Sequence, residues 1–558
     1  MRRYARFVGM LLVAVLISGV LLTSCTQAEP TTTTATQTTT ATQTTTATQT
    51  TTKVTTVTQT TSTPAGPKGE ITIAVNTFHG GAMDPKMMFT FTARLYGLAI
   101  YDQLIGTSVD SLLAPGLAER WEVAADGMSW TFYIRKGVKF HDGSDLTGAD
   151  VKFSIERSLS DENLTGLAPQ WNNLIEAVEL TDEYTVVIHL KHPQAEVWDG
   201  LHNSALGSIE PKKYLEEHGS AYFQANPLGS GPFKLIENEH NVYMELEALD
   251  DHWRSVPKVK TVKLLAVPEE ASRIAMLKTG MVDMAQISPD GVADVERSGL
   301  RVFGYPTGEM SGLALYYDLN NPEKYPISDA RVRKALSLAI NRQELADILF
   351  GGYAAPSALF NAPSSLYFFD DSKLKPDPYD PEEAKRLLAE AGYPDGFEMK
   401  IYSVPWATWM STLNEAIGGY WEKIDVKTEI VPIEWAGLAP KLYPEQSSDL
   451  WGAAVSYVQS GVSGFNLAIS HHSTEGFHKN HLNEELDTAI ETAQATMNWE
   501  ERKRLALEAA ILALEERSIL SILEVDSLWG VADTIDSWTP IPGVESLAFN
   551  LESIILAD

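Results

Sequence analysis

One stretch near the start of the folded part of the chain, residues 130–143, reads WTFYIRKGVKFHDG and decides what kind of structure follows. Trp130, Phe132 and Ile134 alternate with Thr131 and Tyr133, which predicts a half-buried β-strand. The Asp-Gly pair that ends the stretch is typical of a turn. A strand with one face toward a core is therefore expected here.

The residues that follow this turn predict a helix. Thr147 stands where an N-cap residue is expected, and Asp150 occupies the third helical position, as in a capping box. Val151, Ile155 and Leu159 then recur at helical spacing. The pattern predicts an amphipathic helix directly after the strand and its turn.

The same mixture of strands and helices continues to the end of the chain. Further strands are expected at residues 71–75, 185–190, 242–249, 261–267 and 400–404, and further helices after Asp329, after Asp380, at about 484–497 and at about 500–516. From about residue 69 to 558 the class is therefore α/β with some α+β character.

The composition excludes several kinds of protein. The chain has 558 residues and a formal net charge of −31, with 44% hydrophobic and 21% charged residues. This is ordinary globular composition, which excludes wholesale disorder and a polytopic membrane protein. Strong acidity argues against a nucleic-acid partner, which needs clustered Lys and Arg. A single cysteine excludes a disulfide framework and a zinc ribbon.

The first 24 residues predict an exported protein. Three arginines lie within the first six residues, and residues 7–22 are almost entirely apolar but too short for a typical spanning helix. The tripeptide Leu-Thr-Ser then precedes Cys25, which resembles a lipobox. We expect a signal peptide at 1–24 and lipidation of Cys25; the alternative is a plain signal peptide with an incidental cysteine.

A tether is expected between Cys25 and residue 68. Threonine dominates this segment, with Thr-Thr-Thr-Ala-Thr-Gln repeats between residues 32 and 49. Such a composition offers little apolar surface to bury and is typical of a disordered or O-glycosylated stalk. A lipid followed by a spacer would hold a folded body away from a membrane surface.

The sequence lacks the common catalytic motifs. The chain has no GxSxG, HExxH, GxxxxGK[ST] or GxGxxG motif in the required context. His471, His472, His478 and His481 are spaced so that they could bind a transition metal, but a polar loop before a helix is the favoured interpretation. We expect no enzyme activity, no metal and no cofactor.

Aromatic residues near strand ends are the candidate ligand contacts. Strand ends in α/β sheets face ligand crevices, and aromatic walls are common in small-molecule clefts. Core packing is the alternative role for each ring. The six candidates are Phe78, His79, Trp406, Trp409, Trp451 and Tyr457.

Seven motifs in this order resemble the family 5 extracellular solute-binding proteins, which are the oligopeptide-, dipeptide- and nickel-binding components of ABC importers. The motifs lie at residues 113–123 (LAPGLAERWEV), 130–143, 146–151, 227–233 (PLGSGPF), 251–257 (DHWRSVP), 329–336 (DARVRKAL) and 379–394. The resemblance spans nearly the whole folded region.

The resemblance implies a two-lobed, periplasmic-binding-protein-like fold of type II. Lobe I would comprise residues 69–310 with an inserted subdomain, lobe II residues 311–525, and residues 526–558 would return to lobe I. A small solute would bind in the cleft between the lobes, and lobe closure would bury it. A monomer that delivers its solute to ABC permease subunits is implied.

One departure concerns the solute. Peptide binders of this family generally carry an acidic residue that pairs with the peptide's amino terminus, yet residues 456–465 read SYVQSGVSGF, without an acid. A buried ammonium without a counter-charge is costly. We expect an extracytoplasmic, lipid-anchored receptor for a peptide-like or other small solute. The alternatives are a secreted hydrolase on the same scaffold and a surface sensor or adhesin that has lost transport.

Overall fold

The chain divides into two compact units, Met1–Ala65 and Gly66–Asp558. The computed structural model describes residues 66–78, 82–88, 91–107, 113–160, 162, 168–195, 201, 207–359, 373–404, 409–442, 447–459, 483–540 and 550–557. All of these belong to the second unit. The predicted signal peptide, Cys25 and almost all of the predicted tether lie outside the described residues.

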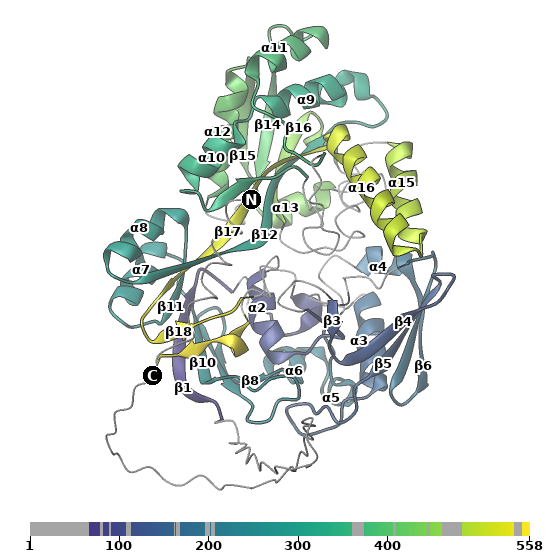
Figure 1. Ribbon diagram of the computed structural model, residues 1–558, viewed down its shortest axis with the longest axis vertical. Coiled ribbons are helices and arrows are strands. Elements are labelled where there is room, and N and C mark those ends of the chain that lie inside the picture. The colour runs from purple at the N-terminus through teal and green to yellow at the C-terminus, as the bar shows by residue number, and fades with distance from the viewer. Residues whose placement is uncertain are drawn as a thin grey trace, which may run out of the picture. The chain divides into compact units, whose positions relative to one another are not determined.

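Eleven strands of the described residues form one mixed sheet (Figure 1). In spatial order they are β15 (Val426–Pro432), β14 (Phe397–Ser403), β16 (Ala453–Gln459), β12 (Arg301–Tyr316), β17 (Ile519–Val531), β11 (Met284–Ile287), β1 (Lys68–Val75), β10 (Val259–Ala266), β9 (Tyr243–Ala248) and β8 (Phe233–Glu239), with β13 (Ala354–Pro356) paired to β17.

Two long antiparallel strands, β12 and β17, join two halves of this sheet. Their pairing runs from Arg301 opposite Val531 to Ala314 opposite Ile519. On its other edge β17 pairs with β13 up to Val525 and with β11 from Leu528 onward. The first half of the sheet is therefore β11, β1, β10, β9 and β8, and the second half is β13, β14, β15 and β16.

Helices cover both faces of the first half. Ile71, Ile73 and Val75 of β1 belong to a core that includes side chains of α2 (Phe91–Ile100), α5 (Lys212–His218) and α6 (Ser220–Ala225). Ala74 belongs instead to a core with α7 (Glu270–Lys278) and α8 (Pro289–Arg297). Neighbouring residues of a strand point to opposite faces, so the apolar second half of β1 contributes to two cores.

A small sheet lies between β1 and β8 in the sequence. It consists of β4 (Ala118–Val123), β5 (Ser129–Ile134), β7 (Thr185–Leu190) and β6 (Ile175–Asp182) in that spatial order, with α3 (Gly148–Leu159) and α4 (Ala168–Leu174) beside it and the short pair β2 (Ile105–Thr107) and β3 (Leu113–Pro115) near it. Trp130, Phe132 and Ile134 are buried, which confirms the predicted strand. The predicted capping box at Thr147 and Asp150 is also present.

The second half of the sheet has its own two cores. One contains side chains of α9 (Ala330–Leu338), α10 (Arg342–Leu349), α11 (Pro381–Glu390) and α12 (Met410–Glu422). The other contains side chains of α13 (Trp435–Leu438), η6 (Ala439–Leu442) and η7 (Ser447–Leu450). Strand β12 supplies Leu313 and Leu315 to the first core, and Ala314 and Tyr316 to the second.

The last part of the chain returns to the first half. After the antiparallel helix pair α15 (Glu484–Ala495) and α16 (Trp499–Glu516), strand β17 leads to β18 (Ile535–Ser537), which pairs with β19 (Ile555–Leu556). Ile535 of β18, with Leu551 and Ile554 of the short segment that includes η8 (Leu551–Ser553), completes the core around β1.

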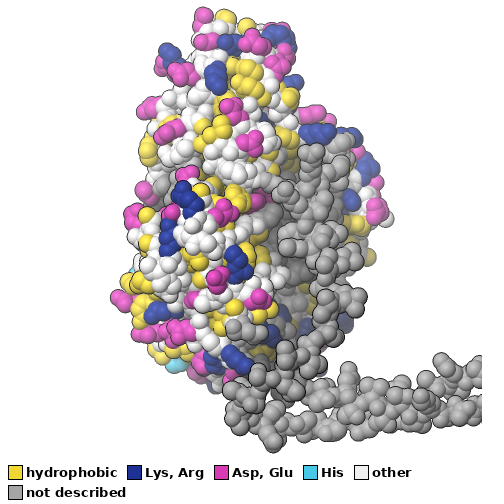
Figure 2. Space-filling view, turned by 60° about the vertical axis from the view of Figure 1, so that its left-hand side comes forward, with side chains coloured by type: hydrophobic (Ala, Val, Ile, Leu, Met, Phe, Trp, Pro, Cys, Tyr) yellow, Lys and Arg dark blue, Asp and Glu magenta, His cyan; other side chains and the backbone are white. Residues whose placement is uncertain are grey.

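The surface carries both signs of charge. On the face shown in Figure 2, acidic and basic side chains are interspersed with small hydrophobic areas. Within the ranges that the structure describes, none of the helices combines the length and the apolar composition needed to cross a bilayer.

Candidate functional site

Phe78, the first candidate residue, lies shortly after the end of β1. Phe78 is 1% exposed and packs edge-on against Tyr96, with ring centroids 6.1 Å apart. Its ring is part of the core that includes α2. His79 lies outside the described residues. Phe78 thus supports this strand end from the side of the core.

Three side chains distant in the sequence form hydrogen bonds with the backbone of residues 82–84. The Tyr96 hydroxyl donates to the carbonyl oxygen of Ala82 at 2.8 Å, and the Tyr101 hydroxyl donates to the carbonyl oxygen of Met83 at 2.9 Å. The Gln224 amide oxygen accepts hydrogen bonds from the backbone N–H groups of Met83 and Asp84, at 2.9 and 2.8 Å. This segment is fixed to α2 and α6 before it enters η2 (Pro85–Met87).

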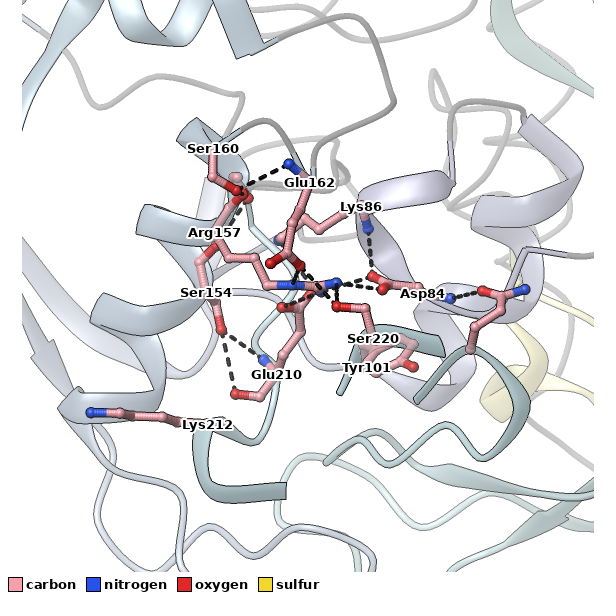
Figure 3. Close-up of polar contacts among 12 residues, drawn as sticks. Asp84, Lys86, Tyr101, Ser154, Arg157, Ser160, Glu162, Glu210, Lys212 and Ser220 are labelled. Carbon is pink, nitrogen blue, oxygen red and sulfur yellow. Dashed lines mark hydrogen bonds and ion pairs between the residues drawn. The ribbon is translucent and has the colours of Figure 1, made fainter. Parts of the chain in front are cut away.

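Four buried charged residues, Asp84, Lys86, Arg157 and Glu210, form what we call the buried charge cluster (Figure 3). Arg157 of α3 donates to both carboxylate oxygens of Asp84, at 2.9 and 2.5 Å, and to Glu210 at 3.0 Å. The Lys86 ammonium lies 3.2 Å from the other oxygen of Glu210. The cluster joins η2, α3 and the segment before α5.

Burial and the neighbouring opposite charges shift the pKa values of this cluster in opposite directions. Burial lowers the pKa of Lys86, although the neighbouring Glu210 carboxylate opposes the change. Burial likewise raises the pKa of Glu210 against the opposing effect of Lys86 and Arg157. For Arg157, burial lowers the pKa, but the bonds to Asp84 and the charge of Glu210 outweigh it and raise the pKa. Removing any one of these charged side chains would leave its partners buried with less compensating charge.

A second buried carboxylate connects two of the sequence motifs. Asp102 accepts from the Trp253 indole at 2.7 Å and from the Ser230 hydroxyl at 3.2 Å, and His252 Nε2 lies 3.2 Å from the same oxygen. Burial raises the pKa of Asp102, but these bonds and the charge of Arg254 outweigh it and lower the pKa. The 227–233 and 251–257 motifs therefore meet at one acid, which is a structural role.

The end of the chain joins this arrangement through Glu552. Arg254 bonds both Asp102 and Glu552. Burial raises the pKa of Glu552, opposed by the Arg254 charge. The C-terminal segment is thereby fixed to the first half of the sheet by charge as well as by its apolar side chains.

In the second half, Tyr457 lies on β16 and faces the core that includes η6 and η7. Its hydroxyl is 3.2 Å from the Tyr316 hydroxyl of β12. Burial raises the pKa of Tyr457 well above its usual value, with Tyr316 adding to the effect. Tyr457 is therefore held as a neutral phenol beside the junction between β12 and β16.

The two described tryptophans of the candidate set are each half-buried. Trp409 directly precedes α12 and lies edge-on to Phe350, with ring centroids 5.3 Å apart. Trp451 precedes β16 and lies edge-on to Tyr325 at 6.3 Å. Trp406 lies outside the described residues. Phe78, Trp409 and Trp451 thus stand in three separate aromatic pairs, and a common contact with one solute remains a prediction.

Two further predictions fall outside the described residues: the lipidation of Cys25 and the histidine group between His471 and His481. Within the described ranges, no three His, Cys, Asp or Glu side chains are grouped as metal ligands. The buried charge cluster was not predicted from the sequence. Its one local signal is Asp84 before Pro85, a pattern typical of a helix start.

The comparisons with known proteins define the family. The family model described as "Bacterial extracellular solute-binding proteins, family 5 Middle" matches residues 113–469, more than half of the chain. Heme-binding protein A of Haemophilus influenzae is 28% identical over 449 residues, covering 74% of this chain and 79% of that protein. The dipeptide-binding protein of Escherichia coli is 30% identical over 362 residues, covering 60% and 66%.

Glutathione-binding protein GsiB of Salmonella typhimurium is 31% identical over 343 residues, covering 61% of this chain and 65% of that protein. The match thus spans a little under two thirds of the glutathione- and dipeptide-binding relatives.

Solved structures show the same fold. The PBP AgaA from A. tumefacien R10, in complex with agropinic acid, has a TM-score of 0.74 at 24% identity, covering 88% of this chain and 99% of that chain. The dipeptide-binding protein from Pseudoalteromonas sp. SM9913, in complex with Met-Leu, has a TM-score of 0.72 at 21% identity, covering 88% and 100%.

These findings place the molecule among two-lobed α/β binding proteins. In this chain the two halves of the described sheet meet at β12 and β17. The chain belongs to the family 5 extracellular solute-binding proteins. The resemblance and the fold class inferred from the sequence are therefore confirmed. Members of this family are extracytoplasmic binding proteins rather than enzymes.

Proposed function

We propose that this chain is the solute receptor of an ABC importer, anchored outside the cytoplasm by a lipid on Cys25. It captures a peptide-like or other small solute between its lobes and delivers it to the permease, acting as a monomer without enzyme activity. The observation that carries the proposal is the family match over residues 113–469, on a fold in which the two halves of the described sheet meet at β12 and β17.

We place the lobes at residues 69–310, 311–525 and 526–558, with the last segment returning to lobe I. Two features support this division. Strand β17 changes its second partner from β13 to β11 between Val525 and Leu528, and the register of β12 against β17 shifts between Pro306 and Glu309. An irregular pairing is where a sheet bends most readily, so lobe rotation would be centred here.

The proposed solute contacts are the six residues Phe78, His79, Trp406, Trp409, Trp451 and Tyr457. The first two follow a strand of lobe I, and the other four flank strands of lobe II, so closure would bring both groups toward one solute. The relatives include proteins named for binding heme, glutathione and dipeptides, which supports the idea that this scaffold serves chemically different solutes. The missing acid in residues 456–465 makes recognition of a free peptide amine the weakest part of the proposal.

Native mass spectrometry of the purified full-length protein tests the proposal. A small molecule released on denaturation identifies the solute, and the chain should then bind it again without converting it. Turnover of that solute into a product would contradict the proposal and support a hydrolase. If the solute is a peptide, its N-acetylated form should bind with similar affinity, because no acid is assigned to the amine.

The cleft assignment has its own test. Trp406→Ala should weaken binding of the identified solute roughly 5- to 150-fold, because burying one aromatic ring against a ligand contributes about 1–3 kcal/mol. Tyr222→Ala is the matched control, since Tyr222 is a 46% exposed ring on α6. Equal affinities for both variants and the unmodified protein, measured by tryptophan fluorescence titration, would remove Trp406 from the site.

A further inference from the structure

The helix pair α15 and α16 belongs to lobe II by its attachments. Arg333 of α9 is buried and bonds the partly buried Glu516 at the end of α16, with Nη2 and Oε1 2.7 Å apart. The next residue, Arg517, forms two 2.8 Å bonds to Asp377. The apolar seam between the two helices also includes Leu359, which follows β13. One end of the pair is therefore fixed to lobe II.

The other end of the pair contacts lobe I. The backbone N–H of Ala195 donates to the Gln494 carbonyl of α15 at 2.9 Å. The carbonyl oxygen of Ala195 accepts from Nη1 of Arg502 at 3.3 Å. Ala195 follows β7 of the small sheet, and Figure 1 shows both helices extending to that sheet.

Both sides of this contact are preformed. On lobe I, the N–H of Gln194 donates to the Gly127 carbonyl in the turn between β4 and β5, at 2.9 Å. On lobe II, the same Nη1 of Arg502 donates to the Thr496 carbonyl at 3.0 Å, and the guanidinium lies 5.2 Å above the Trp499 ring. Arg502 is only 7% exposed. A cation held this firmly loses little additional freedom when it reaches across to Ala195.

We propose that the contacts of Ala195 with Gln494 and Arg502 form a clasp between the lobes, and that Arg502 sets how readily the lobes separate. This inference rests on the proposed function, in which the lobes open and close around a solute. Within the described residues, the strands that continue from one lobe into the other are β12 and β17, so rotation about them would separate the groups of the clasp. Arg502 is a positioning residue in this scheme, because it acts on the lobes without touching the solute.

The test measures lobe separation without any solute. In a full-length Cys25→Ser background, spin labels are attached to Glu179→Cys on β6 and Glu491→Cys on α15, both exposed positions. Pulsed electron resonance then gives the distribution of distances between them. Arg502→Ala should shift the population toward longer distances roughly 10-fold, since hydrogen bonds from a charged group are among the stronger ones. Arg502→Lys should recover part of the shift.

Arg504→Ala is the matched control on the same helix. Arg504 is 52% exposed and bonds Glu501 and Glu508 of its own helix, so the label distances should not change. Ala195→Pro is a second variant, because proline lacks the N–H that bonds Gln494. Unchanged distances in a folded Arg502→Ala or Ala195→Pro variant would overturn the clasp. Since no solute is present, failure here is distinct from failure to bind one.

Discussion

The buried charge cluster shows what single residues contribute to lobe I. Asp84 and Glu210 are almost fully buried, and each has a cation within bonding distance. Such a cluster is weak evidence for stability as a whole, because desolvation offsets most of the attraction between the charges. Removing Arg157 is expected to be costly, because the carboxylates of Asp84 and Glu210 stay buried and both lose this cation.

Arg157→Ala should therefore destabilise the protein by about 3–5 kcal/mol, measured as the free energy of unfolding in urea. Arg120→Ala is the control, because Arg120 and Glu122 form an exposed pair, 54% and 61% accessible, and its loss should have almost no effect. A loss below about 1 kcal/mol for Arg157→Ala would show that water or another group replaces the guanidinium.

Such a cluster lies beyond what sequence patterns can predict. Asp84 and Arg157 are 73 residues apart, and no local rule pairs them. Arg157 lies on a helix that was correctly predicted from Thr147 and Asp150, yet the helical period does not say which distant acid it meets. The aromatic candidates have the same limit: Phe78 was identified from its place after a strand, whereas its contact with Tyr96 follows from packing.

At the scale of helices and strands, local sequence signals were sufficient to predict where helices begin. The predicted caps at Asp329 and Asp380 accept backbone N–H groups of α9 and α11, because capping depends on residues only two or three positions apart. Strand limits shifted by a few residues: the strand expected at 400–404 is β14, Phe397–Ser403. Such limits depend on which neighbour supplies the pairing, and here β15 pairs along the whole of β14.

The 227–233 motif is explained by close backbone contact. A Cβ atom on Gly229 would lie 2.0 Å from the Ile100 carbonyl oxygen. Gly229→Ala should therefore cost about 3 kcal/mol of unfolding free energy, by overpacking against backbone. Gly419→Ala on α12 is the control: nothing lies within 4 Å, and alanine should stabilise the helix by up to about 1 kcal/mol. Equal melting temperatures for the two variants would contradict this account.

The end of α16 provides a prediction about pH. Burial raises the pKa of Asp377, but the two bonds from Arg517 outweigh it and lower the pKa below the usual 3.8. A depressed folded-state pKa contributes stability above about pH 4, and this contribution is lost as the pH falls through the folded-state pKa. The unfolding free energy of Asp377→Asn should therefore fall less steeply than that of the unmodified protein as the pH drops from 5 toward 2. Parallel curves would show that Asp377 keeps its ordinary pKa.

At the scale of the whole molecule, the sheet explains why one scaffold serves many solutes. Its two halves have separate cores and meet at β12 and β17, so residues near the strand ends can change without loss of either core. The sequence predicted this architecture through motifs that fix turns, caps and the Asp102 contacts. It could not predict the solute, because those motifs stabilise the lobes and are independent of the residues proposed to touch it.

The proposed lipid anchor is tested at Cys25, the only cysteine of the sequence. A cysteine carrying several acyl chains holds a protein firmly on a membrane, whereas one chain holds it only marginally. Cys25→Ser should therefore move the protein from the membrane pellet to the soluble fraction after a carbonate wash. Ser24→Ala, which keeps a small residue before the cysteine, should stay in the pellet. Because Gly66–Asp558 is a separate compact unit, both variants should melt at the same temperature. A Cys25→Ser protein that remains in the washed pellet would show that another segment holds it there.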